Sequence, residues 1–356
     1  MFALDPFKVL LPALISFVIG VIIAPSIGQF LVHHKLWKKK NVKKTIDGKD
    51  ATITAALHND ELSPIPRMGG LVVIISVFST AILLWSFSKV YPSILTEKLD
   101  FISRNQTWLP LFAMAVGALV GALDDLLVAE AFGGKLNSYI GGGLSFPVRL
   151  IAVSSLGLFA GSWFYFKLGV EYVYVPFHGN YHLGGLLFIL FFIVVTLATF
   201  STGVIDGVDG LSGGVMSAVF TAYGMIAYAH GQVNISALCF VIVGGIMSFL
   251  WFNIPPALFY LTETGMLALS LGLSVIAFLT NAVLYLPIIA FPLMVTTLSV
   301  ILQLVWKKIF KRKLFLVAPL HHHFQAKGWP AYKVTMRYWI VSYMCAMLGV
   351  VIALIS

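Results

Sequence analysis

Long apolar runs, separated by short polar segments, extend along almost the whole chain. One membrane crossing by a helix takes about 20 apolar residues, and at that length the pattern predicts ten spans. They cover approximately residues 9–32, 67–88, 108–126, 146–166, 184–202, 210–230, 235–254, 263–280, 284–306 and 334–355. We therefore expect an all-α integral membrane protein, with residues 1–356 forming a single polytopic membrane domain.

The composition supports this interpretation. Of the 356 residues, 59% are hydrophobic and 10% are charged, whereas a soluble globular protein has about 25% charged residues. The composition therefore excludes a soluble globule, and we expect membrane lipids and no nucleic acid among its partners. The two cysteines, Cys239 and Cys345, lie inside apolar runs. They therefore indicate neither a disulfide framework nor a cysteine metal site.

The basic residues predict how the chain is oriented. Lys and Arg accumulate in cytoplasmic loops, and most of the 23 basic residues fall in residues 35–67 and 307–337, with Lys135 and Arg149 on the same face. That face is the expected cytoplasmic side, which places both termini outside. Residues 170–182 are rich in aromatic and β-branched residues around a possible turn at 178–180. This pattern predicts a small periplasmic β-hairpin.

Four polar features fall in the connections after odd-numbered spans. Asp124 and Asp125 end the third span, Asp206 and Asp209 interrupt the chain in STGVIDGVDGLSGG after the fifth, Glu263 follows the seventh, and His321, His322 and His323 follow the ninth. Alternating crossings put all of these connections on one face. Carboxylates near hydrocarbon usually face a partner, a cation or water, so this convergence indicates a site.

Each feature also has an ordinary explanation when taken alone. The aspartate pair can be interfacial, and Asp and Gly favour turns. A glutamate suits the start of a helix, the histidines can lie in a solvated loop, and basic loops determine topology. The glycine-rich stretch lacks the endings of a P-loop or an EF-hand, and the histidine spacing is not that of a zinc site.

The convergence favours phosphoryl transfer to a membrane lipid. Mg²⁺ binds a few carboxylate oxygens together with substrate phosphates, and Mg²⁺ with basic residues stabilises phosphoryl transfer. A proton-coupled transporter also uses carboxylates, but these usually lie near the middle of the bilayer. The carboxylates of this chain fall at the ends of the predicted spans.

Several motifs resemble one family over nearly the whole chain. GALVGALDDLL, GVIDGVDGLSGG, WFNIPPALFYLTETGMLAL and APLHHHFQAKGWPAYKVTMRYW are similar to those of bacterial phospho-N-acetylmuramoyl-pentapeptide transferases, within the polyprenyl-phosphate N-acetylhexosamine-1-phosphate transferase superfamily. The aspartate motifs resemble the superfamily at large. The His-His-His-Phe motif followed by Gly-Trp resembles the muramoyl-pentapeptide branch.

The resemblance implies a reaction and its setting. UDP-N-acetylmuramoyl-pentapeptide and undecaprenyl phosphate would give lipid I and UMP for peptidoglycan synthesis, with Mg²⁺ as cofactor. The enzyme would be a homodimer in the bacterial inner membrane, and its site would face the cytoplasm. The resemblance further implies catalytic roles for Asp124, Asp125, His321, His322 and His323, substrate binding by Asp206, Asp209, Gly207, Gly210 and Asn253, and metal binding by Glu263 and Asp125. It does not decide which aspartate is the base, or whether transfer takes one step or two.

The chain departs from the family pattern at several positions. Glu263 replaces the usual metal aspartate of a Gly-Asp-x-Gly-Ser motif, and Gly203 replaces an asparagine. Arg67 replaces the threonine of Pro-Thr-Met-Gly-Gly, and apolar residues 127–129 replace the lysine that usually follows the aspartate pair. Two alternatives therefore remain open. One is a sister transferase of N-acetylhexosamine phosphate, and the other is a weakly active relative that binds lipid phosphate or transports a solute.

Overall fold

The computed structural model describes residues 4–37, 65–102, 105–129 and 143–356, and within these ten helices are long and apolar enough to cross a membrane. All ten predicted spans are confirmed as helices. They are α1 (Leu4–His33), α3 (Gly70–Val90), α5 (Asn105–Val128), α6 (Phe146–Leu168), α7 (Gly185–Ser201), α8 (Leu211–Ala229), α9 (Val233–Asn253), α10 (Thr262–Leu279), α12 (Phe291–Phe310) and α14 (Ala331–Ile355). The basic residues between positions 38 and 49, and Lys135, for which a cytoplasmic location is predicted, lie outside the described residues.

Shorter elements connect or extend these spans. They are the helices α4 (Ile94–Leu99), α11 (Leu286–Ile289) and α13 (Leu320–Ala326), the 3-10 helices η1 (Thr202–Ile205) and η2 (Val283–Tyr285), and the strands β1 (Tyr172–Val175) and β2 (Gly179–His182). Among the described residues the only sheet is the β1–β2 pair, and all other regular secondary structure there is helical.

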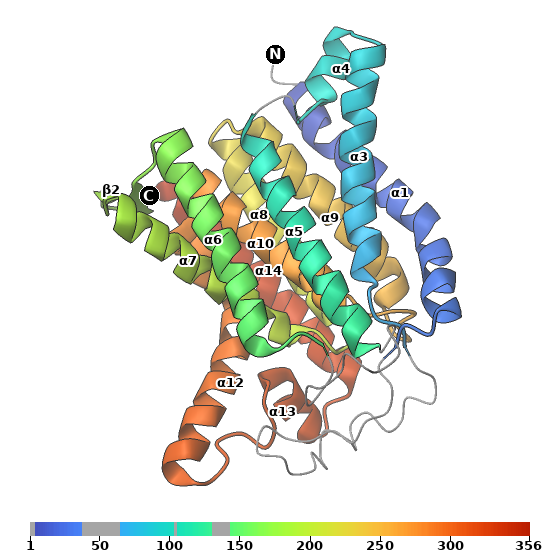
Figure 1. Ribbon diagram of the computed structural model, residues 1–356, viewed down its shortest axis with the longest axis vertical. Coiled ribbons are helices and arrows are strands. Elements are labelled where there is room, and N and C mark those ends of the chain that lie inside the picture. Colours follow the sequence, from blue (N-terminus) through green and yellow to red (C-terminus); the bar gives the residue numbers. More distant parts are fainter. Residues whose placement is uncertain (1–3, 38–64, 103–104, 130–142) are drawn as a thin grey trace.

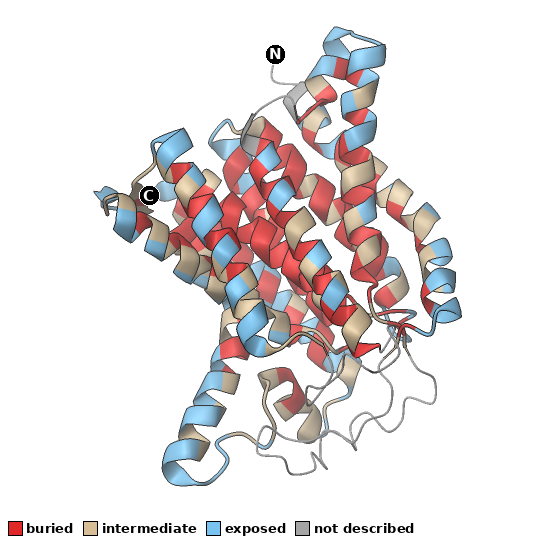
Figure 2. Ribbon diagram, viewed as in Figure 1, coloured by how far each residue is buried: buried red, intermediate tan, exposed pale blue. Residues whose placement is uncertain are grey.

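The most buried helices form the centre of the bundle. α8, α9 and α10 are buried along most of their length, and α1, α3, α5, α7 and α14 pack around them, with α6 against α7 (Figures 1 and 2). α12 leans away from the bundle and exposes most of its surface, which is largely apolar. A helix that is apolar on its exposed side suits a lipid environment, where no water contacts it.

Glycines let α5 approach α10 closely at the end where the aspartate pair lies. A Cβ on Gly121 would lie 2.2 Å from the carbonyl oxygen of Glu263 and 2.7 Å from the Cα of Thr264. Small residues permit such backbone contact between helices in membranes. Because Gly121 lies one helical turn before Asp125, this contact brings the carboxylates of α5 directly against the start of α10.

The ninth span differs from the prediction at its beginning. We expected one helix over 284–306, but η2 and α11 precede a helix that starts at Phe291. Pro287 lies at the start of α11 and Pro292 at the start of α12. Because proline lacks an N–H and clashes with the preceding turn, each is tolerated at a helix start, and together they divide this segment into separate helices.

The hairpin is present, with its turn shifted by two residues from the predicted one. Tyr172 pairs with His182 and Val175 with Gly179 in antiparallel register, so the turn is 176–178, where Phe177 takes a positive φ of 63°. The hairpin lies at the end of the bundle opposite the aspartate pair, and the Tyr174 hydroxyl donates to the Ser356 carbonyl at 2.5 Å. The start of α1 lies at this end too (Figure 1).

Candidate functional site

Asp125 is the most densely hydrogen-bonded side chain of the site. Its Oδ1 accepts from Nε and Nη2 of Arg67 at 3.0 and 2.8 Å. Its Oδ2 accepts from the Thr262 hydroxyl at 2.5 Å, and from the Thr264 hydroxyl and backbone N–H at 2.6 and 2.9 Å. The carboxylate is fully buried. Asp125 therefore joins the end of α5 to the start of α10 and to the segment before α3.

Asp124 and Glu263 share a second guanidinium. Nη2 of Arg149 lies 3.2 Å from Oδ1 of Asp124, and Nη1 donates to Oε1 of Glu263 at 3.0 Å. Oδ1 of Asp124 also accepts from the Leu144 N–H at 2.6 Å. Asp124 is 1% exposed, whereas Glu263 is 25% exposed. Each carboxylate thus has one oxygen anchored, while Oδ2 of Asp124 and Oε2 of Glu263 accept no hydrogen bond from the described residues.

Thr262 connects the aspartate pair to the glycine-rich turn. Its backbone N–H donates to Oδ2 of Asp206 at 2.8 Å, while its hydroxyl bonds to Asp125 and accepts from the Met68 N–H at 2.9 Å. Its φ of 51° is a genuine outlier for a β-branched residue. Such a conformation costs on the order of 1–3 kcal/mol, and these three hydrogen bonds hold the residue in it.

Asp206 is held by the turn that contains it. Oδ1 accepts from the Ser212 hydroxyl at 2.6 Å and Oδ2 from the Thr262 N–H. Burial raises the pKa of Asp206 above its ordinary value, while these two hydrogen bonds and the charge of Arg67 lower it. The carboxylate therefore lies within the field of the same guanidinium that pairs with Asp125.

Asp209, Gly210 and Asn253 fix the second half of the turn. Asn253 is buried; its Oδ1 accepts from the Gly210 N–H at 2.9 Å and its Nδ2 donates to the Phe259 carbonyl at 2.7 Å. Oδ2 of Asp209 accepts from the Ala257 N–H at 3.1 Å. Gly210 has a φ of 71°, and Gly207 one of 130°. Residues other than glycine rarely adopt such φ values, so both glycines are needed for the turn.

The three histidines lie on the short helix α13, which packs against α12 and α14. His321 and His322 are buried, and the His321 ring lies 6.5 Å from that of Tyr338 on α14. One turn earlier on α14, the Thr335 hydroxyl donates to the Asp209 carbonyl at 2.9 Å. The described contacts therefore link the histidines to the aspartates through α14.

His323 is on the outer part of α13. Its Nδ1 accepts from the Leu316 N–H at 3.2 Å, which requires that Nδ1 carry no proton. Burial, followed by the charge of Lys327, lowers the pKa of His323 below its ordinary value. Both observations favour a neutral imidazole at neutral pH.

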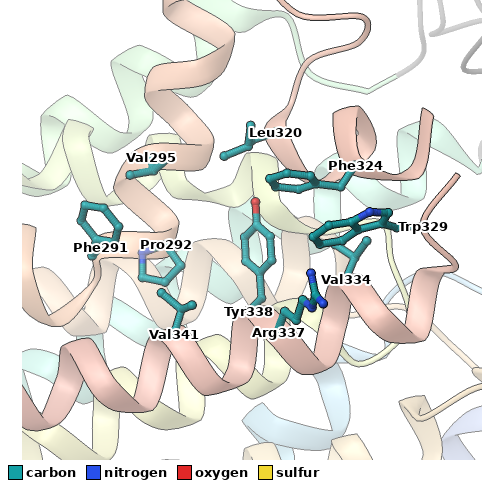
Figure 3. A pocket seen from close by; sticks show the side chains of 10 residues that line it. All are labelled: Phe291, Pro292, Val295, Leu320, Phe324, Trp329, Val334, Arg337, Tyr338 and Val341. Atoms are coloured by element: carbon teal, nitrogen blue, oxygen red, sulfur yellow. The ribbon is translucent and has the colours of Figure 1, made fainter. Parts of the chain in front are cut away.

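An apolar cavity of about 260 Å³ lies beside the histidine helix (Figure 3). Its lining comes from α12, α13, α14 and the residues between the last two: Phe291, Pro292, Val295, Leu320, Phe324, Trp329, Val334, Arg337, Tyr338 and Val341. Phe324 stacks on Trp329 at 4.8 Å between ring centroids, and the Arg337 guanidinium lies 4.2 Å from the centre of the Trp329 ring. This lining suits hydrocarbon, with one cation at its edge.

The charges of the cluster leave room for a divalent cation. Asp124, Asp125, Asp206 and Glu263 face Arg67 and Arg149, so the fully ionised cluster has two excess negative charges. No three His, Cys, Asp or Glu side chains converge as a ready-made metal site in the part of the chain that the structure describes. Mg²⁺ needs only one or two carboxylates plus phosphates and waters. Oδ2 of Asp124 and Oε2 of Glu263 fit this donor set, whereas both oxygens of Asp125 are already occupied.

The structure brings Asp124, Asp125, Asp206 and Glu263 together, as the sequence predicts, while their roles stay predictions. Direct hydrogen bonds join the elements that carry Asp125, Asp206 and Glu263, although these residues are far apart in the sequence. Sequence reasoning missed two arginines, because Arg67 and Arg149 were counted only as residues that set topology. Arg67 had left a signal as a departure from the family pattern; Arg149 had left none beyond its place at the start of a span.

Comparison with known proteins agrees with these motifs. Residues 107–281 match the family described as Glycosyl transferase family 4. A phospho-N-acetylmuramoyl-pentapeptide-transferase of Chlorobaculum parvum is 31% identical, over 94% of this chain and 89% of that protein. Proteins of the same name are 30% identical in Levilactobacillus brevis, over 96% of this chain and 98% of that protein, and 29% identical in Chloroflexus aurantiacus, over 99% and 91%.

Proposed function

The chain belongs to the phospho-N-acetylmuramoyl-pentapeptide-transferase family, and we propose that its carboxylate–arginine cluster performs the transfer for which the family is named. The donor is UDP-N-acetylmuramoyl-pentapeptide and the acceptor is undecaprenyl phosphate. The observation that supports this assignment is the meeting of Asp124, Asp125, Asp206 and Glu263 with Arg67 and Arg149 at one end of the membrane helices. A lipid phosphate reaches such a site from the bilayer, and a nucleotide reaches it from water.

The transfer forms a bond between an oxygen of the lipid phosphate and the phosphorus attached to the sugar. The bond from that phosphorus to the UMP oxygen breaks, and UMP leaves. We assign Asp124 the task of orienting the lipid phosphate and accepting its proton, because Oδ2 is open while Oδ1 is fixed by Leu144 and Arg149. Asp125 fixes Arg67 and the start of α10. The turn at Asp206, Gly207, Asp209 and Gly210, supported by Asn253, lies beside the nucleotide, and His321, His322 and His323 help to hold the phosphates and sugar.

Mg²⁺, when bound, neutralises charge on the reacting phosphates. We propose that Glu263 would hold it through Oε2, with phosphate oxygens and waters as the other ligands, which leaves Oδ2 of Asp124 for the lipid phosphate. The net charge of the fully ionised cluster and the open Oε2 support this role. The hydrogen bonds of Asp125 favour a positioning role for that residue over the metal role that the resemblance implied.

We expect Glu263→Gln to lose activity and to need more Mg²⁺. The amide keeps the size of the side chain and an oxygen that can accept from Arg149, but it removes the negative charge that a hard cation prefers. Initial rates measured over a Mg²⁺ titration test this. Glu97→Gln is the matched control, because Glu97 is exposed in α4 and far from the cluster. An unchanged Mg²⁺ curve in Glu263→Gln would remove Glu263 from the metal site.

The reaction and its side can be tested together. We propose an inner-membrane protein whose site faces the cytoplasm. The basic residues within 307–313 follow α12 at the end of the bundle that carries the carboxylates (Figure 1), and basic residues favour the cytoplasmic side. Inside-out vesicles given radiolabelled UDP-N-acetylmuramoyl-pentapeptide should form labelled lipid, while sealed right-side-out vesicles should do so only after permeabilisation. The opposite pattern would reverse the orientation. Failure in both, with polyprenyl phosphate still bound, would favour the relative that binds lipid phosphate without transferring sugar.

Family membership also leads us to propose a homodimer, and the exposed apolar faces of α1 and α14 provide surface for one. Light scattering of the detergent-solubilised protein should give the mass of two chains. A single-chain mass at micromolar concentration would contradict the dimer.

A further inference from the structure

The guanidinium of Arg67 has an edge that the protein does not use. Nε and Nη2 both donate to one oxygen, Oδ1 of Asp125, and Nη1 has no hydrogen-bond partner among the described residues. The Arg67 side chain is 22% exposed, whereas the Asp125 side chain is fully buried. The positive charge is therefore anchored through one edge and accessible at the other.

Arg149 provides a contrast within the same cluster. Its Nε donates to the Leu144 carbonyl at 3.2 Å, Nη1 donates to Glu263, and Nη2 pairs with Asp124. All three nitrogens are thus engaged by the protein, although the side chain is as exposed as that of Arg67. Arg149 therefore ties elements together, while Arg67 keeps donors for a ligand.

The backbone also holds Arg67 in place. Its N–H donates to the Leu36 carbonyl at 2.7 Å. The next residue, Met68, has a φ of 67°, and its N–H is bonded to the Thr262 hydroxyl at 2.9 Å. A planar guanidinium that is fixed before binding loses little conformational freedom when an anion arrives. Arg67 is thus prepared for an oxyanion at its Nη1 edge.

The charge balance shows why such an edge matters. A phosphate that enters a cluster with excess negative charge is repelled unless a fixed cation faces it. Residues 126–129, which follow the aspartate pair, are Leu, Leu, Val and Ala, so no cation follows the pair on α5. Among the described cations of the cluster, Arg67 is the one with an open donor edge.

We propose that Arg67 is a phosphate-binding residue of the transfer site, its Nη1 edge donating to a phosphate of the nucleotide or of the lipid. This proposal rests on the proposed function. It also connects two departures from the family pattern: the chain lacks a lysine after the aspartate pair, and Arg67 supplies a cation from another segment instead. Asp125 then acts through Arg67, by holding the guanidinium in the orientation that presents this edge.

Binding measurements test the proposal without turnover. The affinity of the purified protein for UMP is compared with that for uridine, and its affinity for a short-chain polyprenyl phosphate with that for the matching polyprenol. Each comparison gives a ratio, the affinity for the phosphorylated ligand divided by the affinity for its unphosphorylated counterpart. We expect Arg67→Met to reduce one of these two ratios about tenfold to a hundredfold, the range for losing hydrogen bonds to a charged group. Loss for UMP assigns Arg67 to the nucleotide phosphate, and loss for the lipid assigns it to the lipid phosphate.

Two further variants make the result decisive. Arg67→Lys keeps a cation beside Asp125, and hence the fold, but lacks the fork of donors; we expect it to reduce the same ratio at least about tenfold. Arg312→Met removes an equal charge from an exposed arginine in the loop after α12, and should change neither ratio. Unchanged ratios in both folded Arg67 variants would overturn the proposal. Wild-type protein that binds these phosphates but makes no lipid-linked product would instead contradict the proposed function.

Discussion

Replacing Asp124 by asparagine should lower turnover at least about a hundredfold, the lower range for removing a positioned acid–base or charge-stabilising group. The fold should survive, because the amide oxygen of asparagine can still accept from the Leu144 N–H and from Arg149. The open Oδ2 is the group that changes most, since it loses its charge and its capacity to take a proton. Turnover is measured with saturating donor and acceptor, and folding by thermal unfolding in detergent.

Asp100→Asn is the matched control for this result. Asp100 is likewise a buried aspartate, but it accepts hydrogen bonds on both oxygens, from the Ser88 hydroxyl and the Ile102 N–H, and it lies in the connection after α4, away from the cluster. It should keep near-normal turnover. Wild-type rates in well-folded Asp124→Asn would remove Asp124 from the chemistry.

Asp125→Ala should lose turnover by a similar factor and also lose stability. Removing this carboxylate leaves the Arg67 guanidinium and the donors of Thr262 and Thr264 without their acceptor. Breaking a buried ion pair in this way costs about 3–5 kcal/mol, and because Arg67 is partly exposed we expect a loss of about 3 kcal/mol. Unfolding in detergent and turnover, measured on the same preparation, test both effects.

The double variant Asp125→Ala/Arg67→Met separates the ion pair from the threonine contacts. Because it removes the unpaired charge, it should recover part of the lost stability while remaining inactive. A double variant that is as unstable as Asp125→Ala would assign the loss to the threonine contacts alone. Wild-type stability and turnover in Asp125→Ala would contradict the positioning role of Asp125.

The contrast between the two neighbouring aspartates could not be predicted from the sequence. Adjacent residues on a helix point in different directions, so Asp124 and Asp125 face different neighbours. Asp125 receives five hydrogen bonds from Arg67, Thr262 and Thr264, whereas Asp124 receives contacts on one oxygen only. Those partners come from distant parts of the chain, and only their packing together assigns the roles.

By itself the sequence determined the ten spans and the meeting of their polar ends, because the length of an apolar run is a local property and alternating crossings put every second connection on one side. It also predicted the hairpin, but not the register of its turn.

The tertiary structure decided what local patterns do not encode. The prolines at 287 and 292 divided the ninth span, Gly121 allowed α5 to touch α10, and Thr262 took a strained conformation to join three segments. Above all, only the structure shows that Arg67 and Arg149 pair with the carboxylates. The sequence cannot show this, because the contribution of a buried charge to stability depends on the groups that surround it.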